Sequence, residues 1–357
     1  MSIPLPREPR RILIVKPSAL GDIVHTLPFL HLLRKRYKTA EISWLVVPAF
    51  AGLLEHHHLL DHVLLFERKR FANLWRDASA AKGLFHFAMS LRREQYDLVI
   101  DLQGLLRSGW ITWQTRAPVR VGFSNAREGA PIFYTHRVPT DTPDKHAIER
   151  YVDIAEALDC GRGPVVFDFG ITDEPRLAVR ELLPDIERYC VLLPGTNWAT
   201  KRWPMEKFAR LVEPIESRFG LRCVIAGGCD VVELATQAPA AINLAGKTNL
   251  KELVALLDGA SLVIANDSGP MHIASALNRP LVTLFGPTNP VRTGPYARPE
   301  TVTRLQIACS PCYSRTCSHH SCMQWLEVEQ VLADAALALH RVIDPAAGIR
   351  GPNEGAK

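Results

Sequence analysis

The sequence predicts an α/β protein made of two Rossmann-like domains in series. Apolar and β-branched runs alternate with helical patterns near the start of the chain, where RILIVK at 11–16 is followed by an amphipathic segment at 23–37. The same alternation begins again with YCVLLP at 189–194. Because alternating strands and helices form parallel sheets covered by helices, we expect one such sheet in each half.

The other expected elements of both halves follow this pattern. A boundary between the two halves is also visible in the sequence. The segments GRGP and LLPD interrupt the alternation between the halves. We therefore predict an N-terminal domain at 1–170, a C-terminal domain at 171–346 whose last helix could pack back on the N-terminal domain, and a loose tail at 347–357. The further expected strands are 42–47, 62–66, 97–101, 222–227, 242–246, 261–266 and 280–286, and the last helix is 327–342.

The composition limits the class of protein. Of 357 residues, 47% are hydrophobic and 22% are charged, which favours a folded globular chain over disorder. The formal net charge of +5 is typical of a solvated surface and gives no indication of nucleic-acid binding. The opening MSIPLPREPR lacks the apolar core of a signal peptide, and no run reaches the roughly 18 apolar residues of a membrane span. We expect a cytoplasmic protein.

Ligands of open parallel sheets bind beyond the carboxyl ends of the strands, so the loops at those ends are candidates for chemistry. The first is KPSALGDIVHTLP at 16–28, in which Gly21 and Asp22 lie where a strand passes into a helix. Gly21 allows another group to approach the backbone closely. Asp22 could simply cap a helix that starts at Ile23, or it could face a substrate, and the local sequence leaves both open.

The loop LPGTNWATKRWP, at 193–204, is suited to binding a diphosphate. Thr196 and Thr200 offer hydroxyl donors, and Lys201 adds a cation just before a helix opened by Pro204. The chain has no G-x-G-x-x-G after its first strand and no G-x-x-x-x-G-K-[ST]. A nucleotide held between two Rossmann-like domains therefore fits better than a dehydrogenase or a P-loop enzyme.

Three more loops follow strands of the second half. AGGCD at 226–230 has paired glycines that can let a ribose or a base lie close to the backbone. In ANDSGPMHIASAL, Asp267 and Ser268 precede a helix start whose free N–H groups would face a phosphate. His272, taken alone, is more typical of a structural histidine than of a catalyst. FGPTNP is most simply a turn.

Five motifs follow one another along the chain: K-x-S-x-x-G-D-x-x-x-x-L-P at 16–28, Y-D-x-V-I-D-x-Q-G-L-x-x-S at 96–108, K-x-W-P at 201–204, D-[ST]-G-x-x-H at 267–272 and G-P-T at 286–288. In this order they resemble the ADP-heptose:lipopolysaccharide heptosyltransferases of glycosyltransferase family 9. The resemblance spans most of the chain and implies a GT-B fold, in which two Rossmann-like domains face a central cleft. It also implies an N-terminal domain that binds the acceptor, a C-terminal domain that binds ADP-heptose, and an inverting reaction without a catalytic metal.

The resemblance implies roles for individual residues. Asp22 matches the proposed base that takes a proton from the acceptor hydroxyl, and Lys201 would stabilise the leaving diphosphate. The implied donor-binding residues are Thr196, Asn197, Thr200, Lys201, Gly227, Gly228, Gly246, Lys247, Asp267, Ser268, Gly269 and His272.

The implied acceptor is an anionic lipopolysaccharide precursor that carries the acidic sugar Kdo. Guanidinium and ammonium groups of the N-terminal domain suit its carboxylates and phosphates, although a basic loop at 68–70 could equally be solvated surface. Such an acceptor would also bring the protein to the cytoplasmic face of the membrane. The expected acceptor-binding residues are Lys16, Ser18, Gln103, Arg68, Lys69, Arg70 and Arg120, the last of which is expected after a strand.

Four of the eight cysteines fall close together in the pattern C-x2-C-x4-C-x4-C. Four thiolates at this spacing can meet without long-range folding, so we predict one structural zinc or iron, with His319 or His320 as a substitute ligand. The alternative is a reduced cluster without a function, because a cytoplasmic disulfide framework is less expected. The residues are Cys309, Cys312, Cys317 and Cys322.

Two other hypotheses stay open. Another GT-B enzyme, such as a different nucleotide-sugar transferase, a protein heptosyltransferase or an epimerase, could use the same fold. The surroundings of Lys16, Gln103 and Arg127 resemble the enzyme that adds the first heptose, whereas the cysteine segment is more similar to second-heptose enzymes and their protein-modifying relatives. A catalytically silent nucleotide-sugar-binding protein is the third hypothesis, and the presence of Asp22 and Lys201 argues against it.

Overall fold

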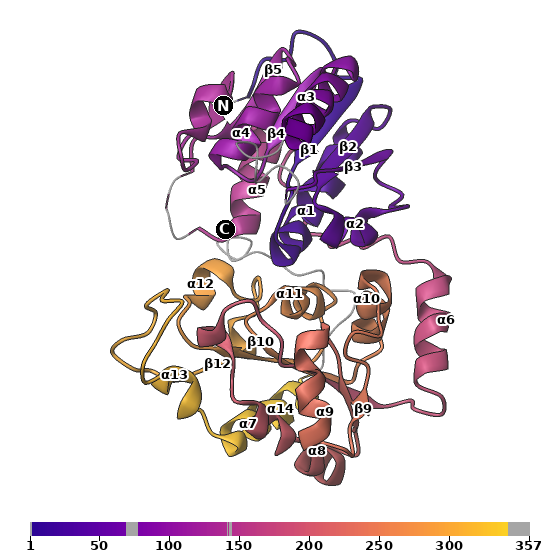
Figure 1. Cartoon of the computed structure of the whole chain (residues 1–357), viewed down its shortest axis with the longest axis vertical. Helices are drawn as coiled ribbons and strands as arrows, with labels where there is room; N and C mark the ends of the chain where they lie inside the picture. The colour runs from indigo at the N-terminus through magenta and orange to yellow at the C-terminus, as the bar shows by residue number, and fades with distance from the viewer. Residues whose placement is uncertain (1, 69–77, 141, 143–144, 342–357) are drawn as a thin grey trace. The chain divides into compact units, whose positions relative to one another are not determined.

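The computed structural model describes residues 2–68, 78–140, 142 and 145–341. The chain divides into two compact units, Met1–Gly170 and Ile171–Lys357. Each unit contains one six-stranded sheet in which all strand pairs are parallel, with helices packed on it (Figure 1). The expectation of one parallel sheet in each half is confirmed.

The first unit has the strand order β3-β2-β1-β4-β5-β6, so the chain winds outward from β1 in both directions. Its strands are β1 (Arg11–Val15), β2 (Glu41–Val46), β3 (His62–Leu65), β4 (Leu98–Asp101), β5 (Val119–Phe123) and β6 (His136–Val138). Its helices are α1 (Leu20–Arg36), α2 (Pro48–Leu54), α3 (Ala78–Arg93), α4 (Leu106–Gln114), the 3₁₀ helix η2 (Ala130–Phe133) and α5 (Ala147–Ala157).

The second unit repeats this winding, because its order β9-β8-β7-β10-β11-β12 places the first strand of the unit, β7, beside β10. Its strands are β7 (Tyr189–Leu193), β8 (Arg222–Ile225), β9 (Ile242–Asn243), β10 (Leu262–Asn266), β11 (Leu281–Phe285) and β12 (Val302–Arg304). Its helices are α6 (Asp173–Leu182), η3 (Ala199–Lys201), α7 (Met205–Ala209), α8 (Val212–Phe219), η4 (Cys229–Val231), α9 (Val232–Gln237), α10 (Leu250–Asp258), α11 (Gly269–Ala276), α12 (Pro290–Thr293), η5 (Pro299–Thr301), α13 (Ser321–Gln324) and α14 (Val328–His340).

The central strands are continuous apolar runs because helices cover both of their faces. Every residue of β7 and β10 is buried, and so is every residue of β1 after Arg11. The last helix, α14, packs on β10, β11 and α8 of the second unit. None of the helices in the described residues is long and apolar enough to cross a membrane.

Three strands were not predicted, and each lacks the signal that marks the others. β6 and β12 have only three residues. β5 has the sequence VRVGF, in which an arginine and a glycine interrupt the apolar run. Arg120 therefore lies within a strand, whereas the sequence analysis placed it after one.

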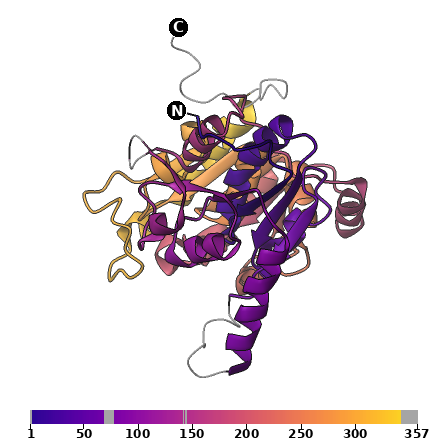
Figure 2. The same ribbon diagram turned by 90° about the horizontal axis from the view of Figure 1, so that it is seen from above.

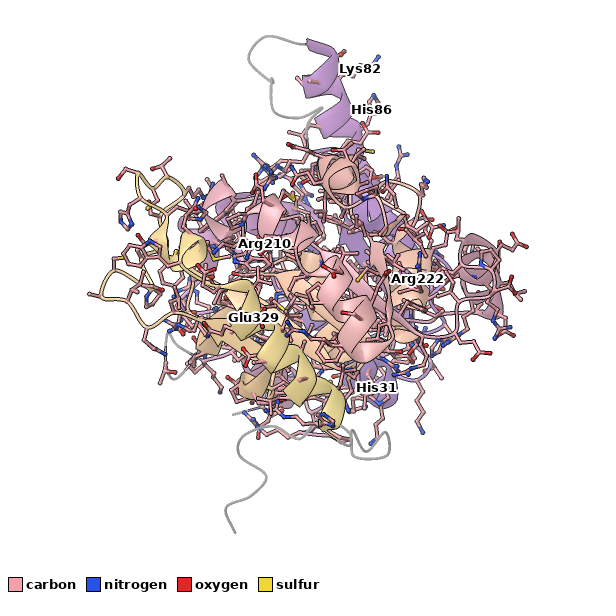
Figure 3. The ribbon with its side chains drawn as sticks, turned by 90° about the horizontal axis from the view of Figure 1, so that it is seen from below. His31, Lys82, His86, Arg210, Arg222 and Glu329 are labelled. Atoms are coloured by element: carbon pink, nitrogen blue, oxygen red, sulfur yellow. The ribbon has the colours of Figure 1, made fainter. Side chains whose placement is uncertain are left out.

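Helix α3 extends away from the rest of its own unit (Figure 2). Lys82 and His86 are exposed on this part of the helix (Figure 3). The buried residues Ala88 and Leu91 lie nearer its carboxyl end, so that end holds the helix to the sheet. Ala80, in the first turn of α3, is also buried.

The carboxylate of Asp97 fastens the segment before β1 to the start of β4. It accepts hydrogen bonds from the backbone N–H groups of Arg10 at 2.8 Å and Arg11 at 3.1 Å, and from Nε of Arg7 at 3.1 Å. Burial alone would raise the pKa of Asp97, but the hydrogen bonds from these three residues outweigh burial and lower it. The folded chain is thereby stabilised by an ionised carboxylate.

We predict that Asp97→Asn lowers the free energy of unfolding by about 1–3 kcal/mol at pH 7, since a charged acceptor is lost. Because the pKa of Asp97 is lowered in the folded chain, its contribution is present above its unfolded pKa and is lost as the pH falls through the folded pKa. The difference between variant and parent should therefore shrink below about pH 4. Urea denaturation at several pH values measures it, with the exposed Asp159→Asn as control. A difference independent of pH would contradict the assignment.

Candidate active site

Lys16 follows β1 directly and is a buried cation of the first unit. Its ammonium donates to the backbone oxygen of Leu102 at 3.0 Å and lies 3.6 Å from Oδ2 of Asp22. It also lies 5.3 Å from the ring centroid of Tyr151 on α5. Burial acts to lower the pKa of Lys16, but the charge of Asp22 and the other neighbours outweigh burial, so the pKa is raised. A stable positive charge therefore stands beside Asp22.

Asp22 combines a capping role with exposure. Helix α1 begins at Leu20 and not at Ile23, so Asp22 is the third residue of the helix and not its N-cap. Its Oδ2 accepts the backbone N–H of Ala19 at 3.1 Å, which satisfies a free donor at the helix start. The side chain is still 41% exposed, so a substrate hydroxyl can reach the carboxylate.

A second buried carboxylate organises the loop after β4. Asp101 accepts the backbone N–H groups of Gln103 at 2.9 Å and Gly104 at 3.0 Å, and the hydroxyl of Tyr134 at 2.7 Å. Burial raises the pKa of Asp101 despite these donors. The side-chain oxygen of Gln103 in turn accepts the backbone N–H of Ser18 at 3.4 Å. Asp101 lies within the motif at 96–108, and its role in organising this loop was not predicted from the sequence.

The structure thus brings Lys16, Ser18, Gln103 and Asp22 together at the carboxyl ends of β1 and β4. The other expected acceptor residues differ. Arg68 is exposed after β3, and Lys69 and Arg70 lie outside the described residues.

Arg120 is placed for a structural role. From within β5, its guanidinium donates to the backbone oxygens of Ala117 at 2.6 Å and Phe133 at 3.0 Å. Burial lowers the pKa of Arg120. Nε and Nη1 of Arg120 are thus engaged with the backbone of its own unit, and the residue lies within β5 and not after a strand. A contact with the acceptor stays a prediction.

In the second unit, three adjacent strands deliver a connected set of polar side chains. Lys201, from the loop after β7, lies 2.7 Å from Oδ2 of Asp267, which follows β10. Thr288, from the loop after β11, donates its hydroxyl to the same oxygen at 2.6 Å. The side chains of Lys201 and Asp267 are only 16% and 5% exposed. FGPTNP is therefore more than the turn that its sequence suggested.

The loop after β7 is fixed to the end of β10 by further hydrogen bonds. The hydroxyl of Thr196 donates to the backbone oxygen of Asp267 at 2.9 Å. The side-chain amide of Asn266 donates to the oxygen of Pro194 at 2.7 Å and accepts the N–H of Trp203 at 3.2 Å. These contacts hold Lys201 in place from both sides of its loop.

The start of helix α11 is suited to an anion. The hydroxyl oxygen of Ser268, the N-cap residue, is buried and has no hydrogen-bond partner within the described part of the chain. A buried hydroxyl that no protein group engages is available to hydrogen-bond an oxygen of a bound anion. Gly269 begins the eight-residue helix, whose first N–H groups carry partial positive charge, and His272 follows on it, buried.

The paired glycines after β8 lie against the loop after β9. The N–H of Gly246 donates to the oxygen of Gly227 at 2.8 Å. Both have positive φ, +130° at Gly227 and +71° at Gly246, and a Cβ at Gly246 would lie 2.6 Å from Sγ of Cys229. Only glycine fits there without rearrangement. Gly228 lies next to this contact, and Lys247 and Asn197 are exposed.

The four clustered cysteines line one cavity of about 310 Å³. Cys309, Cys312 and Cys317 are exposed and Cys322 is buried. Burial and then the three neighbouring thiols raise the pKa of Cys322. Within the described residues no three His, Cys, Asp or Glu side chains are arranged to hold a metal ion. A zinc or iron ion at this cavity stays a prediction.

The loop that carries the four cysteines, residues 309–322, is called the cysteine loop, and it also supports the cluster around Asp267. The ring nitrogen Nε2 of His320 lies 2.8 Å from the backbone oxygen of Thr200, and the hydroxyl of Thr200 donates to the oxygen of Ser314 at 2.8 Å. Thr200 is thus engaged with the cysteine loop and does not offer the free hydroxyl that the sequence suggested. The N–H groups of Cys312 and Tyr313 donate to the oxygen of Pro287, at 3.0 and 2.8 Å.

Two Rossmann-type sheets, with polar side chains gathered at the ends of β7, β10 and β11, are typical of the class of nucleotide-binding α/β proteins. The chain matches glycosyltransferase family 9 (heptosyltransferase) over residues 84–323. It is 34% identical over 320 residues to lipopolysaccharide heptosyltransferase 1 of Pseudomonas aeruginosa, covering 87% of this chain and 88% of that protein. The chain therefore belongs to glycosyltransferase family 9 and is a transferase.

Solved structures agree on the fold. Escherichia coli heptosyltransferase WaaC with ADP is 26% identical with a TM-score of 0.75, covering 92% of this chain and 99% of that chain. E. coli ADP-heptose lipopolysaccharide heptosyltransferase II, at 23% identity and a TM-score of 0.71, covers 92% of this chain and 98% of its own and shows the fold alone. The predicted GT-B fold class is confirmed.

We predict that Thr288→Val lowers the free energy of unfolding by about 1.5–3 kcal/mol, because a buried hydrogen bond to a charged carboxylate is lost at nearly constant volume. Urea denaturation measures this loss. Thr293→Val is the matched control, since Thr293 is exposed and its hydroxyl donates to the backbone oxygen of Asn289 at 3.3 Å, not to a charged group. Equal stability of the two variants would mean that Thr288 does not hold Asp267.

Proposed function

We propose that the protein transfers heptose from ADP-heptose to the Kdo- and heptose-containing inner core of a lipopolysaccharide precursor, with inversion at the anomeric carbon. Family membership supports the heptosyl transfer. The name of the Pseudomonas relative supports the acceptor class, and the ADP in the WaaC structure supports the donor. The observation that carries the proposal is the buried Lys201–Asp267 pair next to the unpartnered hydroxyl of Ser268.

The donor site is proposed to hold the diphosphate by charge and by hydrogen bonds. Lys201 supplies the cation, and Ser268 with the first N–H groups of α11 supplies donors for phosphate oxygens. Negative charge grows on the diphosphate as the bond to the sugar breaks, so groups fixed there beforehand stabilise the transition state more than the bound donor. Asp267 keeps Lys201 oriented and would face the heptose hydroxyls.

The acceptor hydroxyl is proposed to lose its proton to Asp22. The acceptor oxygen bonds to the anomeric carbon, the bond from that carbon to the diphosphate oxygen breaks, and the proton moves to a carboxylate oxygen of Asp22. Lys16, whose ammonium lies 3.6 Å from this carboxylate, places a positive charge beside it. Ser18 and Gln103 line the same loop ends and are proposed to contact the acceptor.

We predict that Asp22→Asn reduces kcat by roughly 10²–10⁴-fold without unfolding the protein, since the amide cannot take the proton. The amide oxygen of Asn can still accept the N–H of Ala19, so the helix start is preserved. Asp22→Ala removes both functions and should lose about 1 kcal/mol of stability as well. Steady-state kinetics and thermal denaturation separate the two roles. Wild-type turnover of the Asn variant at neutral pH would leave Asp22 as a cap only.

We predict that Lys201→Ala costs about 2–4 kcal/mol in transition-state stabilisation and weakens ADP binding. Its removal also leaves Asp267 with an uncompensated buried charge, so thermal stability must be measured alongside. Arg210→Ala is the control, because Arg210 is an exposed cation of the same unit (Figure 3). Calorimetry with ADP and kinetics at saturating and subsaturating donor check the prediction. If ADP affinity and the kinetic constants of Lys201→Ala both matched those of the parent, Lys201 would be a structural residue.

The donor and the acceptor are tested in one set of assays. We expect turnover of ADP-heptose but not of UDP- or GDP-sugars, and we compare Kdo-lipid A with an acceptor that already carries heptose. Turnover of Kdo-lipid A alone would identify the first heptose addition, and turnover of the heptosylated acceptor alone would identify a later addition. Binding of ADP-heptose without transfer to either acceptor would contradict the proposed acceptor class.

A further inference from the structure

Helix α4 of the first unit has one face in the core and an opposite face that exposes large apolar side chains. Its core side carries Ile111 and Thr112, both fully buried. On the other side Leu106 and Trp113 are seven residues apart, which places them on one face of a helix, and they are 48% and 49% exposed. Such exposure costs free energy in water unless another surface covers it.

The 3₁₀ helix η2 continues this apolar face. The rings of Trp113 and Phe133 lie 6.3 Å apart between centroids. A Cβ at Gly109 would lie 2.7 Å from the Phe133 ring, so α4 and η2 are packed as closely as their backbones allow. Ile132, the neighbour of Phe133, is 70% exposed. We call Leu106, Trp113 and Ile132, together with Phe133, the α4–η2 surface.

The α4–η2 surface carries positive charge along its border. Arg107 and Arg116 are exposed on α4 and just after it, and Arg137 donates from Nε to the backbone oxygen of Pro131 in η2 at 3.0 Å. None of these three arginines forms an ion pair with a described residue of the chain. Among the described residues, Glu128 also borders this surface and accepts the N–H of Leu106 at 3.2 Å. These four side chains together carry a net positive charge.

We propose that the α4–η2 surface docks on an anionic lipid bilayer. A tryptophan beside exposed aliphatic side chains is suited to the boundary between acyl chains and headgroups. Unpaired arginines around it complement negatively charged headgroups. This inference rests on the proposed function, in which the acceptor carries a lipid. Docking would hold the acceptor-binding unit at the membrane where that acceptor lies. The charge of the border favours this occupant over an apolar protein partner.

The test is flotation of the full chain with vesicles of phosphatidylethanolamine and phosphatidylglycerol at 3:1, against vesicles of phosphatidylcholine alone. We expect binding to the anionic vesicles only. The double variant Trp113→Ser, Ile132→Ser should bind at least tenfold more weakly, and Arg116→Gln and Arg137→Gln about fivefold each, with added salt acting in the same direction. Leu177→Ser with Val291→Ser is the matched control, since those side chains are 54% and 68% exposed in the second unit.

ADP affinity and thermal denaturation confirm that each variant is folded. Equal vesicle binding by the surface variant and the control would overturn the proposal. A change in oligomeric state on light scattering, without a change in vesicle binding, would also overturn it and assign the surface to a second copy of the chain. Vesicle binding needs no turnover, so its failure and a failure of the transfer assays are separate results. If the parent protein both binds vesicles and transfers heptose, the surface variant should lose activity on acceptor in vesicles and keep it on a delipidated acceptor.

Discussion

The buried ion pair between Lys201 and Asp267 is the interaction on which the second unit's site depends. Removing two charges from water is expensive, and the cost is offset only if the geometry is good and further hydrogen bonds satisfy the remaining atoms. Thr288 supplies one of these bonds, to the oxygen that also meets Lys201. The three residues follow β7, β10 and β11, which are neighbours in the sheet. The winding of the chain is therefore what brings them together.

The first unit also contains a buried lysine beside a carboxylate, but there the carboxylate is exposed. Lys16 also follows the central strand of its sheet and is also buried beside a carboxylate. There the carboxylate, Asp22, is 41% exposed, whereas Asp267 is 5% exposed. A buried carboxylate orients its cation, and an exposed one can exchange a proton with a substrate. In the proposed mechanism, Asp22 takes the acceptor proton and the Lys201–Asp267 pair serves the leaving diphosphate, so the two units would use one arrangement for two tasks.

The sequence predicted the central strands and the loops of the site because those features are local. Buried parallel strands read as apolar runs, and the loops after them carry glycine, serine and threonine. β5 was missed because Arg120 interrupts its run, although the aliphatic part of an arginine can pack while its guanidinium binds backbone oxygens. The roles of Thr200 and Thr288 were missed for another reason. Their partners lie 114 and 21 residues away, and no local pattern records such pairs.

The cysteine loop shows how far such long-range contacts extend. It binds the backbone oxygens of Thr200 and Pro287, the residues that directly precede Lys201 and Thr288. A backbone oxygen accepts the same hydrogen bond whatever side chain its residue carries. The contact therefore leaves no trace in the sequence of the two loops that contain Thr200 and Pro287.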